Sequence, residues 1–201
     1  MSLLRENRFN NIYKTSKSSG CGSYKENTTF FNKILREFIQ NNNIKSILDL
    51  GCGNFESMED IVNDFDINYL GTDISEIIIE YNKQKYGKNF IQLDVVNSDL
   101  KHFNHDLIIF RHIIQHLNFN DSQAAIKNIF NSNCKFLLVN HQYGLIENED
   151  KQIQESGWAN QMYNLNIHPF NLKNNEILNV TDIDNHVIDI GQHECYSFYK
   201  I

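Results

Sequence analysis

The sequence has 201 residues, of which 41% are hydrophobic and 21% are charged, a composition that indicates one packed domain and excludes a disordered chain. No apolar run approaches the roughly 18 residues that a transmembrane helix needs, so a membrane-spanning protein is not expected. The formal net charge of -7 disfavours a polyanionic partner, and we do not expect binding to bulk nucleic acid.

The N-terminal residues contain Arg5, Glu6 and Arg8 and show no apolar signal-peptide core, so we expect a cytoplasmic protein with one domain across residues 1–201. The four cysteines, at positions 21, 52, 134 and 195, form no CxxC pair, which favours reduced thiols over disulfides or a zinc site. We expect no metal. The sequence leaves the monomer and the homodimer open.

Residues 1–27 are rich in Ser, Gly, Asn and Lys, which predicts a polar N-terminal arm that can act as a lid. After this arm, residues 28–40 place apolar side chains three and four positions apart, which predicts an amphipathic helix with Asn27 or Thr28 as its N-cap. The apolar residues of this helix are Phe30, Phe31, Ile34, Leu35, Phe38 and Ile39.

From residue 44 onward, apolar strand patterns alternate with helical patterns. We expect strands at 44–50, 68–72, 89–93, 106–110 and 135–140, and helices at 57–64, 75–85 and 121–131. Such alternation predicts right-handed crossovers and a doubly wound, mostly parallel sheet of the α/β class. A ligand is then expected beyond the carboxyl ends of the strands.

The C-terminal third breaks this alternation. Residues 141–180 form a polar segment that is too long for an ordinary connection, which predicts a lid or substrate loop inserted in the domain. Strand patterns at 186–190 and 195–200, joined by a turn at Gly191, predict a C-terminal antiparallel hairpin. The expected sheet therefore has seven strands.

A glycine-rich turn follows the first expected strand, in the run Asp49-Leu50-Gly51-Cys52-Gly53. Glycines let the backbone pass close to a ligand because they have no Cβ, which indicates a nucleotide-like ligand. Glu56 stands where a dinucleotide-binding GxGxxG motif has its third glycine, so the turn does not favour a diphosphate.

Three aspartates end three successive expected strands. Asp49 can meet an ammonium group through hydrogen bonds, Asp73 can accept both hydroxyls of a ribose, and Asp94 is placed for an adenine amino group. A single aspartate here is as often a helix N-cap, but three in this order favour a ligand that joins an amino acid to an adenosine. S-adenosylmethionine is such a ligand.

These residues resemble the class I S-adenosylmethionine-dependent methyltransferases, whose glycine-rich motif, ribose-binding acid and adenine-binding acid match residues 49–53, Asp73 and Asp94. The resemblance implies a Rossmann-like methyltransferase fold with S-adenosylmethionine as cofactor. More narrowly, the chain is similar to a little-characterised bacterial-type group with SGxGS, RDxxxHL and GW…NL…PF segments, here at 19–23, 111–117 and 157–172. The expected cofactor-binding residues are Asp49, Leu50, Gly51, Cys52, Gly53, Asp73, Ile74, Asp94, Val95, Arg111, Gly20, Gly22 and Ser23.

The loop after the fourth expected strand contains the candidate catalytic residues His116, His112 and Arg111. His116 is the first candidate for a base, since an unperturbed imidazole titrates near about pH 6.5. His112 stands where the similar methyltransferases have an aspartate, so the role of their carboxylate cannot be assigned to His112. The alternative is that His112 packs near the cofactor without a catalytic role. Together with His141 these histidines could resemble a metal site, an alternative in which a carboxylate ligand is missing.

The acceptor is expected to meet the segment 141–180. The candidate substrate-binding residues are His141, Trp158, Tyr163, Asn164 and Phe170, because aromatic faces often stack on sugars and small rings. Anchoring of the segment to the core is the alternative for the aromatic residues.

We expect O-methylation of a small polar acceptor, and the resemblance alone points to a saccharide or a surface-polymer substituent. A non-catalytic cofactor-binding or partner-activating subunit, a nucleic-acid methyltransferase and an oxidoreductase are the alternatives. The Asp/Asn-Pro-Pro-aromatic segment of nucleic-acid amino-methyltransferases is absent after the fourth expected strand, where the sequence reads Phe110-Arg111-His112-Ile113.

Overall fold

The computed structural model describes residues 2–16, 18, 24, 27–87, 89–149, 161–181 and 193–201. Its centre is a seven-stranded sheet in the order β3-β2-β1-β4-β5-β7-β6. The first five strands along the chain pair in parallel, whereas β7 is antiparallel to both β5 and β6. The expected doubly wound, mostly parallel α/β sheet is therefore confirmed. The strands are β1 (Ser46–Leu50), β2 (Asn68–Asp73), β3 (Phe90–Gln92), β4 (Leu107–Phe110), β5 (Phe136–Tyr143), β6 (Glu176–Thr181) and β7 (His193–Lys200).

The C-terminal antiparallel strands are confirmed, but the strand that precedes the last one differs from the expectation. β6 runs from Glu176 to Thr181, at the end of the segment for which we expected a loop, and the expected strand at 186–190 lies outside the described residues. β6 is an edge strand whose Ile177 and Leu178 are about half exposed, and its pairing with β7 holds it in the sheet. A hydrophobic pattern cannot reveal a strand that buries so little apolar surface.

Four helices cover the sheet: α2 (Thr29–Asn42), α3 (Glu59–Phe65), α4 (Glu76–Tyr86) and α5 (Phe119–Phe130). Successive strand residues point to opposite faces, so β1 directs Ile47 into one hydrophobic cluster and Leu48 into another. α2 and α3 pack on the first cluster and α5 packs on the second. The central strands β1, β4 and β5 are thus buried on both faces, as their continuous apolar runs predict.

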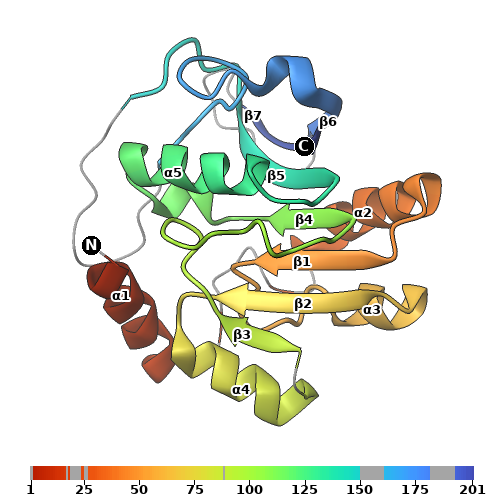
Figure 1. Ribbon diagram of the computed structural model, residues 1–201, viewed down its shortest axis with the longest axis vertical. Helices are drawn as coiled ribbons and strands as arrows, with labels where there is room; N and C mark the ends of the chain where they lie inside the picture. Colours follow the sequence, from red (N-terminus) through yellow and green to blue (C-terminus); the bar gives the residue numbers. More distant parts are fainter. Residues whose placement is uncertain are drawn as a thin grey trace.

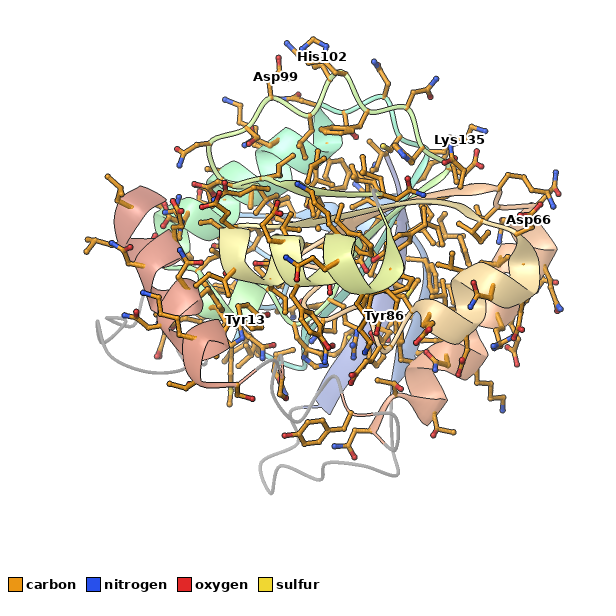
Figure 2. The ribbon with its side chains drawn as sticks, turned by 90° about the horizontal axis from the view of Figure 1, so that it is seen from below. Tyr13, Asp66, Tyr86, Asp99, His102 and Lys135 are labelled. Atoms are coloured by element: carbon orange, nitrogen blue, oxygen red, sulfur yellow. The ribbon has the colours of Figure 1, made fainter. Side chains whose placement is uncertain are left out.

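Helix α1 (Ser2–Thr15) occupies most of the region where we expected a polar arm. It lies beyond the carboxyl ends of β1, β2 and β4, on the side toward which their arrowheads point (Figure 1). Tyr13 is 3% exposed and points from α1 into the molecule (Figure 2). α1 has no broad apolar stripe, because Leu3 and Leu4 are exposed, and polar contacts with distant residues hold it instead.

Within the described part of the chain, no helix combines the length and the apolar character that crossing a membrane requires.

Candidate functional site

The turn between β1 and α3 is built from glycines in a left-handed backbone conformation. Gly51 has φ 82 and Gly53 has φ 53. The backbone N–H groups of Gly51 and Cys52 both donate to the carbonyl of Thr72, at 2.7 and 2.8 Å, which ties the turn to the end of β2. A Cβ on Gly51 would lie 2.2 Å from Cδ1 of Ile113, so the turn packs directly against the loop after β4.

Asp73, the last residue of β2, is hydrogen-bonded to this turn. Its Oδ2 accepts from the N–H of Gly53 at 3.2 Å, and its Oδ1 accepts from the N–H of Ser75 at 2.9 Å. Burial raises the pKa of Asp73 to about 6, although these backbone hydrogen bonds lower it in part. Each carboxylate oxygen retains a lone pair, so Asp73 can accept two further hydrogen bonds from a ligand diol.

Asp49 lies on the adjacent strand, 5% exposed, with its Oδ2 accepting from the hydroxyl of Tyr69 at 2.7 Å. Burial raises the pKa of Asp49 to about 6, against the hydrogen bond from Tyr69 and the positive charge of Arg111. A buried carboxylate of this kind is best matched by a cationic ligand group, since an opposite charge offsets its desolvation.

Asp94 follows β3 and differs from the other two aspartates, because it forms an ion pair with Arg5. Its Oδ2 accepts from Arg5 Nη2 at 2.8 Å and from Asn97 Nδ2 at 2.7 Å, while its Oδ1 accepts from the N–H of Val96 at 3.1 Å. Burial disfavours its ionised form, but the hydrogen bonds from Arg5 and Asn97 outweigh burial and hold the pKa of Asp94 below its usual value. Oδ1 retains a lone pair for a ligand amino group.

Arg5, which was not predicted from the sequence as a site residue, joins α1 to Asp94 and to α5. Its Nη1 donates to Oδ2 of Asp121, in the first turn of α5, at 2.5 Å, and its side chain is 9% exposed. No local motif marks such a residue, because its partners lie 89 and 116 positions away along the chain. α1 thus contacts both the third acid and α5.

Arg111 lies on the same side of the sheet as Asp49. Its guanidinium is 4.6 Å from the centroid of the Phe31 ring on α2, and its Nη2 donates to Ser57 Oγ at 3.2 Å. Its charge lowers the pKa of Asp49 in part. A guanidinium beside a buried carboxylate can pair with both an acidic ligand group and the acid next to it.

His112, next in the chain, has φ 55 in the left-handed region. This conformation costs a non-glycine residue on the order of 1 kcal/mol or more, and such strain is concentrated at functional sites. The side chain of Asn140 on β5 compensates for it by accepting from the N–H of His112 at 2.6 Å. Asn140 was not identified from the sequence.

His116 ends the short 3-10 helix 114–116 and is 7% exposed beneath α1. Its backbone carbonyl accepts from Arg8 Nη2 at 2.8 Å, and its ring meets the edge of Phe9 at a centroid distance of 5.9 Å. α1 therefore covers the histidine that we expect as the first candidate base.

His141 points to the face of the sheet opposite Asn140, because adjacent β5 residues alternate. Its Nε2 lies 2.9 Å from Ser197 Oγ and 3.1 Å from the hydroxyl of Tyr199, and its Nδ1 accepts from the N–H of Leu165 at 3.3 Å. In the part of the chain that the structure describes, no three His, Cys, Asp or Glu side chains form a group that could hold a metal ion.

The described aromatic candidates of the segment 141–180 pack on the core. Tyr163 is 1% exposed, its hydroxyl donates to the carbonyl of Leu117, and its ring contacts Phe170. Asn164 donates to the carbonyl of Leu145, within the same segment. These contacts agree with the alternative that the aromatic residues anchor the segment to the core. Trp158 lies outside the described residues.

The remaining expected cofactor residues fall into three groups. Leu50 and Val95 turn their side chains into the hydrophobic core, so only their backbones can meet a ligand, and Cys52 is also buried. Ile74 is half-buried directly after Asp73. Gly20, Gly22 and Ser23 lie outside the described residues.

The carboxylates and the glycine turn at these strand ends fit S-adenosylmethionine. The two buried carboxylates with raised pKa suit an ammonium group and a diol. The third carboxylate, which is paired to an arginine, suits an amino group. The turn beside them has no room for a Cβ. The same three acids would repel a diphosphate.

Residues 47–132 match the family model of the methyltransferase domain, whereas no curated protein matches the chain in sequence. The chain is similar in structure to magnesium protoporphyrin IX methyltransferase from Synechocystis PCC 6803 with bound SAM, with a TM-score of 0.68 and 14% identity over 99% of this chain and 96% of that one. It is also similar to the N-methyltransferase NodS from Bradyrhizobium japonicum WM9 in complex with S-adenosyl-L-homocysteine, with a TM-score of 0.68 and 11% identity over 96% and 98% of the two chains.

A third similar structure is the methyltransferase domain of the bacterial protein CtHen1, with a TM-score of 0.63 and 17% identity over 87% of this chain and 99% of that one. At these identities the structural likeness concerns the fold. The family match adds the type of domain, and the glycine turn and its acids lie within the matched residues. Residues 47–132 therefore match a methyltransferase domain, and the chain has the fold of these methyltransferase structures.

Proposed function

We propose that this protein transfers the methyl group of S-adenosylmethionine to an oxygen of a small polar acceptor, such as a saccharide or a surface-polymer substituent. The observation that supports the cofactor is the meeting of Asp49, Asp73 and Asp94 at the carboxyl ends of three adjacent parallel strands, around the glycine turn. Two of the similar structures carry bound SAM or S-adenosyl-L-homocysteine, which agrees with this proposal.

Each acid has one proposed role. Asp49 accepts from the ammonium group, Asp73 accepts from both ribose hydroxyls, and Asp94 accepts from the adenine amino group through Oδ1. The remaining oxygen of Asp94 stays with Arg5 and Asn97. Arg111 meets the carboxylate of the amino-acid end, where its charge also stabilises Asp49.

The backbone around the acids completes the proposed cofactor site. Gly51 and Gly53 allow close approach of the chain, and the backbones of Leu50, Cys52, Ile74 and Val95 line the same strand ends. The segment 19–23, with Gly20, Gly22 and Ser23, stays a prediction as a cover for the cofactor.

On the acceptor side, the bound cofactor supplies a methyl group on a sulfonium, which a nucleophile takes by in-line displacement. His112 and Arg111 follow directly after β4 and are partly exposed. His116 is the proposed acceptor of a hydroxyl proton, and Arg8 and Phe9 of α1 contact it. The net charge of -7 favours a neutral or cationic acceptor over a polyanion.

Isothermal titration with S-adenosylmethionine and S-adenosylhomocysteine tests the cofactor. Wild type should bind both, and Asp73→Ala should lose at least about tenfold in affinity, because two ribose hydrogen bonds to a charged group disappear. Asp64→Ala, which removes an exposed carboxylate paired with Arg36, should bind like wild type. A wild type that binds neither ligand contradicts the proposal.

The acceptor is then screened by methyl transfer from labelled S-adenosylmethionine to neutral saccharides, small phenols and short oligonucleotides. Transfer to saccharides supports the proposed class, whereas transfer to oligonucleotides overturns it. Cofactor binding without transfer to any of the acceptors, together with a partner that co-purifies, would indicate the non-catalytic subunit instead.

A further inference from the structure

Asn140 on β5 clamps His112 by two hydrogen bonds. Its Oδ1 accepts from the backbone N–H of His112 at 2.6 Å, and its Nδ2 lies 3.1 Å from His112 Nδ1. Asn140 is 2% exposed, so this amide is held in one place by the surrounding protein. The clamp thus fixes both the backbone and the ring of a residue with φ 55.

The two contacts decide which ring nitrogen carries the proton. A backbone N–H can only donate, so it must face the oxygen of the Asn140 amide, and the NH2 group of that amide then faces Nδ1. An NH2 group only donates, so Nδ1 must accept. A neutral imidazole has one accepting and one protonated nitrogen, which places the proton of His112 on Nε2.

Gln115 does not reverse this assignment. Its Oε1 is 3.4 Å from Nδ1 of His112, a longer contact than the 3.1 Å to Asn140 Nδ2. The backbone N–H of His112 fixes the orientation of the Asn140 amide but not that of the Gln115 amide. The Gln115 amide can therefore rotate and direct its nitrogen toward Nδ1.

We propose that Asn140 is a positioning residue that keeps neutral His112 in the Nε2–H form, so that His112 donates a hydrogen bond to the methyl acceptor and does not remove its proton. This inference rests on the proposed methyl transfer. The acceptor that suits it presents an oxygen lone pair to Nε2–H beside the methylated position. Any proton that the acceptor loses must go to another group, and His116 is the candidate on the same loop.

The tautomer is measured directly by long-range 1H–15N correlation spectra of the uniformly labelled protein at a pH where imidazole is neutral. His112→Gln identifies the signals of His112 by their loss. Wild type should show the proton on Nε2. Asn140→Asp should move it to Nδ1, because a carboxylate has no N–H and accepts from both groups. Asn131→Asp, which adds the same charge at the exposed C-cap of α5, should leave the tautomer unchanged.

A proton on Nδ1 in wild type, or on Nε2 in Asn140→Asp, would overturn the assignment. Unchanged signals from the other histidines show that each variant is folded. Binding of S-adenosylhomocysteine is measured on the same samples. If wild type fails to bind it, the proposed function fails while the tautomer result stands.

The role of His112 is tested with an acceptor from the screen. Glutamine places an amide N–H near the position of Nε2–H, so His112→Gln should stay within about threefold of the wild-type rate, while His112→Ala should fall about tenfold or more. If His112 were the base, both variants would fall by about a hundredfold or more, and the proposal would be wrong.

Discussion

The hydroxyl of Tyr69 on β2 donates a hydrogen bond of 2.7 Å to Oδ2 of Asp49 on β1. Tyr69 pairs with Ile47, two residues before Asp49, so its ring reaches along the sheet toward the glycine turn. Gly71 leaves the space that the ring needs, since a Cβ there would lie 3.0 Å from Cε1 of Tyr69 and 2.6 Å from the Phe90 ring. The carboxylate that we propose for the cofactor ammonium is therefore oriented by the neighbouring strand.

Tyr69→Phe should weaken cofactor binding. A hydrogen bond to a charged group contributes about 1.5–3 kcal/mol, so we expect the affinity for S-adenosylhomocysteine to fall about tenfold or more at pH 8. Calorimetric titration measures this loss. Tyr86→Phe removes a hydroxyl from the same group of rings around Phe55 and should stay within about twofold of wild type. Equal affinities of Tyr69→Phe and wild type would show that the hydroxyl does not orient Asp49.

Cofactor affinity should fall in mild acid. Burial raises the pKa of both Asp49 and Asp73 to about 6 in the free protein. The bound ammonium and hydroxyl donors favour the ionised acids and lower their pKa, so binding is strongest above pH 6 and weakens as pH falls through that value. We expect the Kd for S-adenosylhomocysteine to be constant from pH 7 to 8 and to rise about tenfold from pH 6 to 5. Asp49→Asn should flatten this dependence, and a flat wild-type profile contradicts the roles of both acids.

The parts of this site that the sequence could predict are those set by short-range rules. Asp49 and Asp73 stand at the ends of apolar strands, and the glycine turn follows the strand of Asp49, so strand length and turn chemistry place them. β5 was predictable for the same reason. The carboxyl ends of parallel strands meet at one edge, which brings these residues together without further information.

The parts that could not be predicted depend on distant partners. Arg5 is one charged residue in a polar helix, and only the fold brings it to Asp94 and Asp121. Asn140 is the fifth residue of an apolar strand, where its side chain is defined by a loop 28 positions earlier. A hydrophobic pattern carries no signal for such contacts, because they bury polar groups rather than apolar ones.

Arg5→Ala should release α1 from the domain. Its removal leaves the carboxylates of Asp94 and Asp121 without their shared cation, and breaking a buried ion pair in this way costs about 3 kcal/mol. Hydrogen exchange of residues 2–15 should speed up markedly, while exchange of the central strands should stay unchanged. Arg36→Ala, which breaks an exposed pair with Asp64, should cost less than about 1 kcal/mol in chemical denaturation. Unchanged protection of α1 in Arg5→Ala would contradict this account of how the helix is held.

His141 should make the protein sensitive to acid. Burial lowers the pKa of His141 from 6.5 to about 4 in the folded chain. The unfolded chain therefore binds a proton between these values that the folded chain does not, so the free energy of unfolding is highest above pH 6.5 and is lost as pH falls toward 4. The loss from this group is about 3 kcal/mol.

The variant His141→Gln isolates that contribution, because the other groups titrate in both proteins. The stability of wild type relative to His141→Gln, from urea denaturation, should decrease by up to about 3 kcal/mol between pH 7 and pH 4. A difference that stays constant with pH would mean that the pKa of His141 is the same in the folded and unfolded chains.

Gly51→Ala should disrupt the glycine turn for two separable reasons. The backbone of Gly51 has φ 82, which costs an L-residue about 1–2 kcal/mol, and the new Cβ would lie 2.2 Å from Cδ1 of Ile113. Gly87→Ala is the matched control, since Gly87 has φ 112 and nothing within 4 Å of a Cβ. We expect Gly51→Ala to cost about 1–3 kcal/mol more than Gly87→Ala and to abolish measurable binding of S-adenosylhomocysteine.

Ile113→Ala separates the two causes, because it removes the atoms that the new Cβ would meet. In a double-mutant cycle followed by urea denaturation, Gly51→Ala should cost about 1–2 kcal/mol less in the Ile113→Ala background than in wild type. The backbone strain remains in both backgrounds, so the residual cost should approach that of Gly87→Ala. If the cost of Gly51→Ala is the same with and without the Ile113 side chain, contact between the turn and the loop after β4 does not determine why glycine stands at this position.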